Sequence, residues 1–149
     1  MIYDGGSTDG TAEMVARHRD VVTGFVSEPD RGEAHGFNKA ILASRGDIIK
    51  VLTDDDHFYP DAMRRAVATM EENPDVDALI CGGDAYIGSG DEERFWLNFR
   101  LPESASGIDL EAIFRHLNCG LGLLFRRRII PLVGLFDTTF AAVDTQYLV

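Results

Sequence analysis

Three consecutive carboxylates follow a short apolar run in the middle of the chain, and this junction constrains the fold more than any other feature. Residues 48–52 are Ile-Ile-Lys-Val-Leu and predict a buried strand; Asp54, Asp55 and Asp56 follow, and Pro60 begins a helical pattern. Carboxylates this close repel one another unless a cation or a hydrogen-bonding ligand lies among them. Oxygen ligands suit Mg²⁺ or Mn²⁺, ions that often also bind ligand phosphates. An exposed acidic loop without a ligand explains the same residues equally well, and the spacing is not that of an EF-hand.

Bulk properties narrow the class of protein. The 149 residues suffice for one domain with one core, and a net charge of -11 argues against nucleic acid as the main partner. With that charge, an anionic ligand such as a nucleotide diphosphate needs a local cation or a helix N-terminus. The two cysteines, Cys81 and Cys119, form no disulfide framework, which favours a reducing compartment. No apolar run approaches the roughly 20 residues of a membrane span. We therefore expect a cytoplasmic protein that reaches the inner face of the membrane only through a partner or a further segment.

Apolar patterns of strand and helix length alternate along the first half of the chain. The expected strands are residues 1–3, 21–26, 48–52 and 76–87 with an interruption at Gly82-Gly83, and the expected helices are residues 12–18, 34–42 and 60–73. This alternation predicts an α/β fold with a mainly parallel sheet, in which ligands bind beyond the carboxyl ends of the strands. Asp4 and the Asp54–Asp56 cluster both follow such strands, so we expect them to share a site.

Other polar segments have a structural and a functional interpretation. Residues 4–11, Asp-Gly-Gly-Ser-Thr-Asp-Gly-Thr, place glycines and capping residues between a strand and a helix, a layout that also directs backbone N–H groups at an anion. The segment lacks the GxGxxG dinucleotide pattern, and an ordinary capped turn explains it as well.

Arg31 precedes the 34–42 helix, within reach of an anion, although a single loop arginine is more often solvated. Arg126–Arg128 predict a solvated surface turn, with a phosphate contact as the alternative. Gly46 is expected at the C′ position that ends the 34–42 helix.

Taken in order, these segments resemble the family 2 glycosyltransferases of the GT-A fold. The resemblance covers nearly the whole chain and is carried by residues 4–11, residues 27–32 (Ser-Glu-Pro-Asp-Arg-Gly), Asn38-Lys39, Gly46-Asp47, Asp54–Asp56, and Gly134-Leu-Phe-Asp137 followed by Asp144. It implies one three-layer α/β/α domain over residues 1–149 with a mainly parallel mixed sheet. Residues 1–87 would form the nucleotide-sugar-binding half, and residues 88–149 would form the acceptor-side half.

The resemblance also implies a donor and a metal. The donor would be a nucleotide-diphospho-sugar, first of all a UDP-sugar, bound with Mg²⁺ or Mn²⁺. Asp4 corresponds to an acid that contacts the base, and Arg31 to a contact of the nucleotide. The acidic cluster corresponds to the DXD region, with Asp54 and Asp55 on the donor and Asp56 on the metal. Thr53 stands where the family often has an acid or Asn, so the register leaves open which of the three aspartates binds the ion.

For the reaction, the resemblance implies an inverting, hexosyltransferase-type enzyme of cell-wall or polysaccharide biosynthesis. Asp144 corresponds to the catalytic base that takes the proton of the acceptor hydroxyl. The acceptor would be a saccharide or a lipid-linked molecule. These roles rest on the resemblance, because a single aspartate on a helix is usually a surface residue.

The chain departs from the family at both ends. Family members have an N-terminal strand before the position of Asp4 and continue beyond that of Asp144, so we expect a fragment. A missing first strand would expose a neighbouring strand edge and favour a homodimer. The alternative function is a non-catalytic, truncated nucleotide-binding or interaction module of the same fold. A nucleotidyltransferase would need a basic phosphate-binding loop near the N-terminus, which this sequence lacks.

Overall fold

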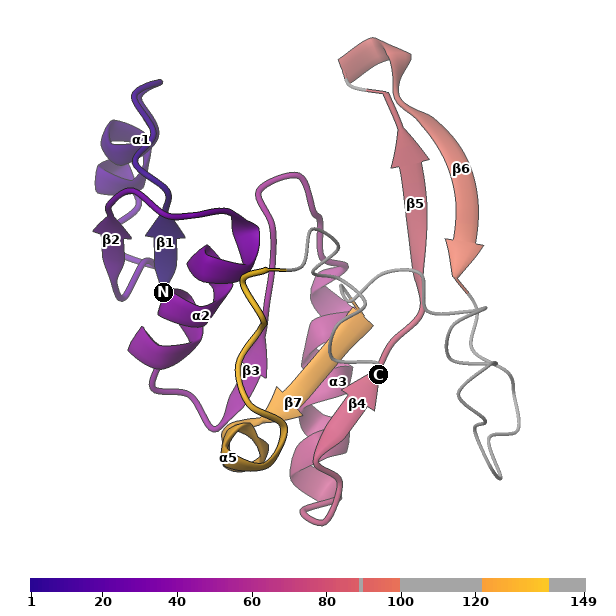
Figure 1. Ribbon diagram of the computed structural model, residues 1–149. Helices are drawn as coiled ribbons and strands as arrows, with labels where there is room; N and C mark the ends of the chain where they lie inside the picture. The colour runs from indigo at the N-terminus through magenta and orange to yellow at the C-terminus, as the bar shows by residue number, and fades with distance from the viewer. Residues whose placement is uncertain (89, 100–121, 140–149) are drawn as a thin grey trace.

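The computed structural model describes residues 1–88, 90–99 and 122–139 (Figure 1). In chain order its elements are β1 (Ile2–Asp4), α1 (Thr11–Arg17), β2 (Phe25–Ser27), α2 (Glu33–Ala43), β3 (Ile48–Lys50), α3 (Pro60–Glu72), β4 (Ala78–Ile80), β5 (Gly83–Ile87), η1 (Gly90–Glu92), β6 (Arg94–Phe99), β7 (Leu123–Arg126), η3 (Arg127–Ile129) and α5 (Ile130–Val133). The predicted alternation of strands and helices is confirmed, although the strands are shorter than the apolar runs from which they were predicted.

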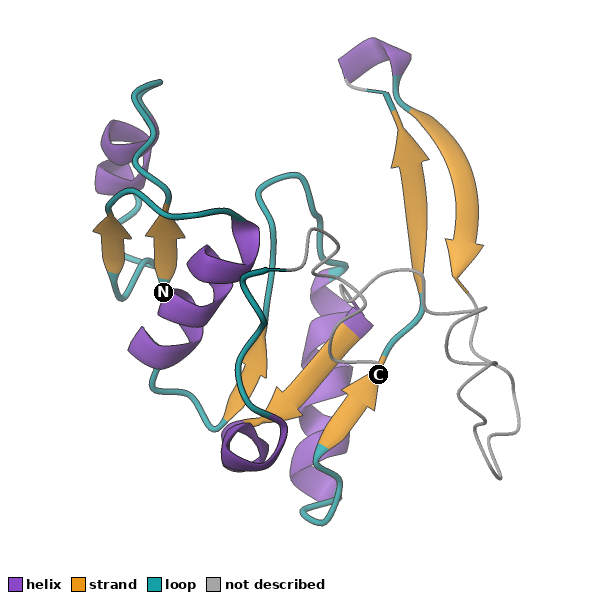
Figure 2. Ribbon diagram, viewed as in Figure 1, coloured by secondary structure: helices purple, strands orange, loops and turns teal. Residues whose placement is uncertain are grey.

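The described strands form three small sheets. β1 and β2 pair in parallel, with Asp4 opposite Ser27, whereas β7 lies antiparallel between β3 and β4. β5 and β6 form an antiparallel hairpin that stands away from the rest of the molecule (Figure 1). The arrows of β1, β2, β3 and β4 point toward the same end of the molecule (Figure 2). Because β7 lies between β3 and β4 and is antiparallel to both, these two strands share a direction without pairing, and this three-stranded sheet is antiparallel.

The hydrophobic core has two sides that meet at β7. Phe125 packs with Ile41 of α2 and Ile49 of β3. The preceding residue of β7, Leu124, packs with Ala66 and Met70 of α3. Successive strand residues point to opposite faces of a sheet, so α2 and α3 cover opposite faces. The predicted three-layer α/β/α arrangement is therefore present around β3, β7 and β4. Full burial of each large side chain contributes about 1.5–3 kcal/mol.

The end of α2 differs from the sequence expectation. Gly46 was expected at C′, but the helix ends at Ala43 and the C-cap is Ser44, whose backbone is extended. The Ser44 hydroxyl donates to Ile41 O over 2.8 Å. Arg127 completes the cap, because its guanidinium donates to Gly46 O at 2.8 Å and to Ser44 Oγ at 2.6 Å. A cation from a distant segment thus replaces the glycine that normally ends a helix.

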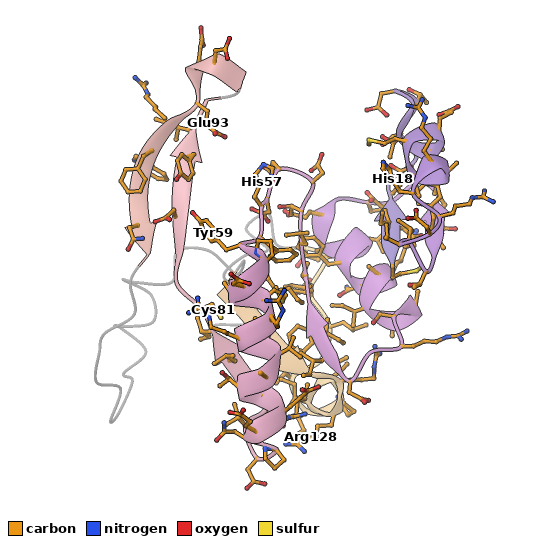
Figure 3. The ribbon with its side chains drawn as sticks, turned by 180° about the vertical axis from the view of Figure 1, so that it is seen from behind. His18, His57, Tyr59, Cys81, Glu93 and Arg128 are labelled. Atoms are coloured by element: carbon orange, nitrogen blue, oxygen red, sulfur yellow. The ribbon has the colours of Figure 1, made fainter. Side chains whose placement is uncertain are left out.

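The other two arginines of the basic run secure the end of α3. Arg126 donates to the carbonyl oxygens of Met70 and Val76, and Arg128 binds Asp77 Oδ1 at 2.6 Å. Figure 3 shows Arg128 beside the C-terminal end of α3. The prediction of a solvated turn was wrong, because Arg126–Arg128 span the end of β7 and the start of η3 and donate to carbonyls, a hydroxyl and a carboxylate of the fold.

The structure also bears on the two cysteines and on the question of a membrane-spanning helix. Cys81 is a half-buried free thiol whose pKa is raised by burial, and Cys119 lies outside the described residues. Within residues 1–88, 90–99 and 122–139, none of the helices has the length and apolar character needed to span a bilayer.

Candidate functional site

Asp4 is the last residue of β1, and its buried carboxylate accepts hydrogen bonds from neighbouring protein groups. The side chain is 8% exposed. Its Oδ2 accepts hydrogen bonds from Gly6 N at 3.2 Å, Ser7 N at 3.0 Å and Ser27 Oγ at 2.5 Å, and its Oδ1 accepts from Ser7 Oγ at 2.5 Å. The hydroxyl of Ser27, then that of Ser7, lowers the pKa of Asp4. Asp4 therefore fixes the loop after β1; its predicted contact with a base stays a prediction.

The loop from β1 to α1 contains a second carboxylate, Asp9, which accepts hydrogen bonds from a residue two positions further along the chain. Gly6 and Gly10 adopt φ of 94° and 95°, which non-glycine residues rarely do. Asp9 accepts from Thr11 N at 3.1 Å and Thr11 Oγ1 at 2.6 Å, and these bonds lower the pKa of Asp9. The glycines and capping residues seen in the sequence thus act as a turn that leads into α1.

Asp30 lies against this loop and was not singled out from the sequence. Its Oδ1 accepts from Gly32 N at 2.9 Å, which turns the chain toward α2. A Cβ atom at Gly5 would lie 2.8 Å from Asp30 Oδ2, and one at Gly36 would lie 3.2 Å from the same oxygen. The carboxylate thus sits where two glycines, one beside Asp4 and one inside α2, leave room for it. The signal in the sequence was a glycine within a helix, where glycine is unfavourable.

A cluster of Tyr3, Glu28 and Lys39 joins β1, the loop after β2, and α2. Lys39 Nζ lies 2.7 Å from Glu28 Oε1 and 5.0 Å from the centroid of the Tyr3 ring, and the Tyr3 hydroxyl donates to Glu28. The hydrogen bond with Glu28 raises the pKa of Lys39, and the same contact lowers the pKa of Glu28. Lys39 is therefore committed to the fold and is not available to neutralise a ligand.

Arg31 remains at the mouth of α2. Its backbone N–H donates to His35 Nδ1 at 3.0 Å, which places the residue in the first turn before the helix. The residue is exposed, and its guanidinium has no hydrogen bond or ion pair within the described part of the chain. This is consistent with the predicted contact of Arg31 with an anion, which stays a prediction.

The acidic cluster is organised by Thr53. Thr53 Oγ1 donates to Asp56 Oδ2 at 2.6 Å and Thr53 N donates to the same oxygen at 3.3 Å. Asp56 is half-buried, while Asp54 and Asp55 are exposed. The residue that departs from the family pattern thus has a role, because it orients one of the three carboxylates. Only Asp56 is held in this way among the three.

The loop that carries these aspartates is secured at its far end. Figure 3 shows His57 at the tip of the loop and Tyr59 where α3 begins. The Tyr59 hydroxyl donates to Asp84 Oδ2 at 3.0 Å, and Asn98 of β6 donates to Asp84 Oδ1. The bond to Asp84 raises the pKa of Tyr59. The acidic loop is therefore attached to the β5–β6 hairpin as well as to β3.

The carboxylates of the described residues do not form a complete metal site by themselves. Among the residues that the structure describes, no three His, Cys, Asp or Glu side chains come together as a metal cage. Mg²⁺ commonly takes one or two protein carboxylates and completes its shell with waters and ligand phosphates. The oriented, half-buried Asp56 fits an ion of that kind, held jointly with a ligand, and does not fit a site built from protein side chains alone.

Downstream, Asn38 binds the segment that leads toward residue 144. Its Nδ2 donates to Phe136 O at 2.7 Å, and Phe136 N donates to its Oδ1 at 2.8 Å. The rings of Phe37 and Phe136 lie 5.5 Å apart. Asp137 accepts from Thr139 N at 2.8 Å and is thereby part of a local turn. Asp144 itself lies outside the described residues, so its predicted role as base stays a prediction.

The layered architecture, with organised acidic loops after β1 and β3 at one end of the molecule, is that of a GT-A glycosyltransferase domain. TarS of S. aureus, residues 1–349, superposes with a TM-score of 0.69 over 97% of this chain and 42% of that chain, at 19% identity. A mannosyltransferase of Pyrobaculum calidifontis, solved with GDP-Man and Mn²⁺, superposes with a TM-score of 0.59 over 97% of this chain and 39% of that chain, at 25% identity.

The sequence gives the family. The chain belongs to glycosyl transferase family 2, whose family model matches residues 1–131. It is 27% identical over 143 residues to an uncharacterized glycosyltransferase of Rickettsia conorii and 25% identical over 142 residues to one of Rickettsia felis. Each comparison covers 92% of this chain and 23% of the relative, so the chain spans about a quarter of the length of these proteins.

Proposed function

We propose that this domain transfers a sugar, with inversion, from a nucleotide-diphospho-sugar to a hydroxyl of an acceptor. The observation that carries the proposal is the Thr53–Asp56 contact, which orients one carboxylate beyond the carboxyl end of β3. The Asp4 loop follows β1, a strand that points toward the same end of the molecule (Figure 2). Membership of glycosyl transferase family 2 supports the reaction class.

The donor would bind across these loops. Asp56 would hold a divalent ion together with the diphosphate, and Asp54 and Asp55 would accept hydrogen bonds from the ribose or the sugar. When bound, the ion neutralises the negative charge that develops on the leaving diphosphate. The mannosyltransferase neighbour, solved with GDP-Man and Mn²⁺, supports a nucleotide-sugar and a divalent ion. Arg31 would contribute a cation whose guanidinium has no partner within the described part of the chain, and Asp4 would hold the loop that faces the base.

Transfer requires a base for the acceptor. In this proposal Asp144 takes the proton of the acceptor hydroxyl while its oxygen attacks the anomeric carbon and the bond to the diphosphate breaks. Attack from the face opposite the leaving group inverts the configuration at that carbon. The Asn38–Phe136 contact holds the chain at Phe136, which precedes Asp144 in the sequence.

The acceptor side belongs to the same proposal. We assign nucleotide-sugar binding to residues 1–87 and acceptor binding to residues 88–149. The β5–β6 hairpin presents Tyr86, Phe95 and Trp96 as exposed aromatic side chains. Aromatic surface of this kind suits a saccharide or the saccharide part of a lipid-linked acceptor. Cell-wall or polysaccharide synthesis on the cytoplasmic side of a membrane, by a hexosyltransferase that associates as a dimer, is the corresponding biological setting.

Calorimetric titration tests the donor site. UDP and GDP are each titrated with and without Mn²⁺ into the wild-type chain, Asp56→Asn and Asp75→Asn. Asp75 is an exposed carboxylate beyond the far end of α3, so its amide is a matched control. Binding that needs Mn²⁺ and is lost only in Asp56→Asn supports the proposal. No binding of either nucleotide to folded wild-type protein would contradict it.

A transfer assay separates catalysis from binding. The donors whose nucleotide binds are supplied with saccharide and lipid-linked acceptors, and Asp144→Asn serves as the base variant. Transfer by the wild type and its loss in Asp144→Asn with unchanged nucleotide affinity supports the assigned roles. Nucleotide binding without transfer to any of these acceptors would identify the alternative, a non-catalytic binding module.

A further inference from the structure

The carboxylate of Asp4 has little capacity left for a ligand. A carboxylate offers about four lone-pair sites. The hydrogen bonds from Gly6, Ser7 and Ser27 engage both oxygens of Asp4, and the side chain is buried beneath the loop that it binds. Another acceptor is therefore needed if the loop after β1 recognises the donor nucleoside through an acid.

Asp30 supplies such an acceptor beside the same loop. Gly32 N binds only its Oδ1, and its Oδ2 has no hydrogen-bond partner among the described residues. Oδ2 lies against the backbone of Gly5, the neighbour of Asp4, and against Gly36 of α2. The side chain is half-buried, so one oxygen is held by the protein and the other is open.

We propose that Asp30 is the specificity residue that accepts a hydrogen bond from the nucleoside of the donor, whereas Asp4 is a positioning residue for the loop. The inference rests on the proposed function. A carboxylate repels phosphate oxygens, so the group that Oδ2 binds must be a hydrogen-bond donor, either an N–H of the base or a ribose hydroxyl. The glycines at positions 5 and 36 belong to the same arrangement, because a Cβ at position 5 would lie 2.8 Å from Oδ2 and displace it, and one at position 36 would crowd it at 3.2 Å.

Asp30→Asn is the direct test. Asparagine keeps the size of the side chain and an oxygen for Gly32 N, but it replaces the open acceptor with a donor. The probe is the nucleoside diphosphate that binds more tightly with Mn²⁺, and pyrophosphate with Mn²⁺ is the probe that lacks a nucleoside. We expect the Kd of the nucleoside diphosphate to rise about 10- to 100-fold, as for a lost hydrogen bond to a charged acceptor, and that of pyrophosphate to stay constant.

Gly5→Ala gives an independent perturbation that leaves the carboxylate in the sequence. Its Cβ would lie 2.8 Å from Asp30 Oδ2, whereas a Cβ at Gly83 would meet nothing within 4 Å. Gly5→Ala should therefore weaken nucleoside diphosphate binding, and Gly83→Ala should not. Circular dichroism of each variant confirms that it is folded before its titration is interpreted.

The outcomes separate this inference from the function on which it rests. Unchanged nucleoside diphosphate affinity in folded Asp30→Asn, or an equal loss for pyrophosphate, overturns the assignment of Asp30 and leaves the donor site intact. No nucleotide binding by the wild type overturns the proposed function and this inference together. Two nucleotide analogues then identify the group that donates its hydrogen bond to Asp30: one with a methylated base nitrogen and one without the ribose 2′-hydroxyl. The analogue that lacks this group binds to the wild type and to Asp30→Asn with the same affinity.

Discussion

The side-chain amide of Asn38 pairs with both backbone groups of Phe136, 98 residues further along the chain. Asn38 is 9% exposed, so the two hydrogen bonds are largely withdrawn from water. The contact joins α2, which packs against β1, to the segment after α5. It therefore couples the loop side of the domain to the part of the chain that leads toward Asp144.

Replacement of Asn38 should destabilise the domain. Asn38→Ala removes the two hydrogen bonds that the largely buried side chain makes with the N–H and C=O of Phe136, and each such bond contributes about 0.5–1.5 kcal/mol. The free energy of unfolding, measured with urea, should fall by about that amount or more. Asn73→Ala is the matched control, because its exposed side chain makes one bond, to Thr69 O. Equal losses in the two variants would contradict the role of Asn38.

Arg127 should be irreplaceable by lysine at the end of α2. Its guanidinium reaches Gly46 O, Ser44 Oγ and Ile41 O, three acceptors in different directions. A lysine ammonium is a single point of charge and does not reproduce that fork. We expect Arg127→Lys to lose about 1–2 kcal/mol of the free energy of unfolding. Arg45→Lys, at an exposed position of the neighbouring turn, should change it by less than about 0.5 kcal/mol, measured in the same urea series.

Acid should weaken the loop after β1 through Asp4. The hydroxyl of Ser27, then that of Ser7, holds the pKa of Asp4 below its ordinary value of 3.8. The stability that Asp4 contributes is thus fully present above that value and is lost as the pH falls through the folded pKa. Unfolding curves of the wild type and Asp4→Asn, recorded as the pH is lowered, should converge at acid pH. Ser27→Ala should show a smaller acid-dependent loss than the wild type. A constant difference between wild type and Asp4→Asn at all pH values would contradict this linkage.

The sequence predicted the elements and the location of the site better than the contacts within it. Pro60 and the apolar spacing that follows define α3 almost to the residue, because helix starts and faces are local properties. The contacts of Arg126–Arg128 were not predictable in this way, since the acceptors include carbonyls of the loops after α2 and α3, 50 or more residues away. Asp30 was missed for the same reason: its neighbours Gly5 and Gly36 come together only when β1 and α2 pack.

Thr53→Val should separate the orientation of Asp56 from its charge. Valine has nearly the shape of threonine but lacks the hydroxyl that donates to Asp56 Oδ2 at 2.6 Å. The carboxylate remains in the sequence, so any loss reports on its position. Loss of a group that orients a metal-binding carboxylate costs about 10- to 100-fold in metal affinity. We expect a loss of that size in the Mn²⁺-dependent affinity for nucleoside diphosphate, measured by calorimetry.

Thr53→Ser keeps the hydroxyl and should bind like the wild type. If Thr53→Val binds Mn²⁺ and nucleotide normally, the orientation of Asp56 does not matter for the donor site, and Asp54 or Asp55 becomes the candidate for the metal.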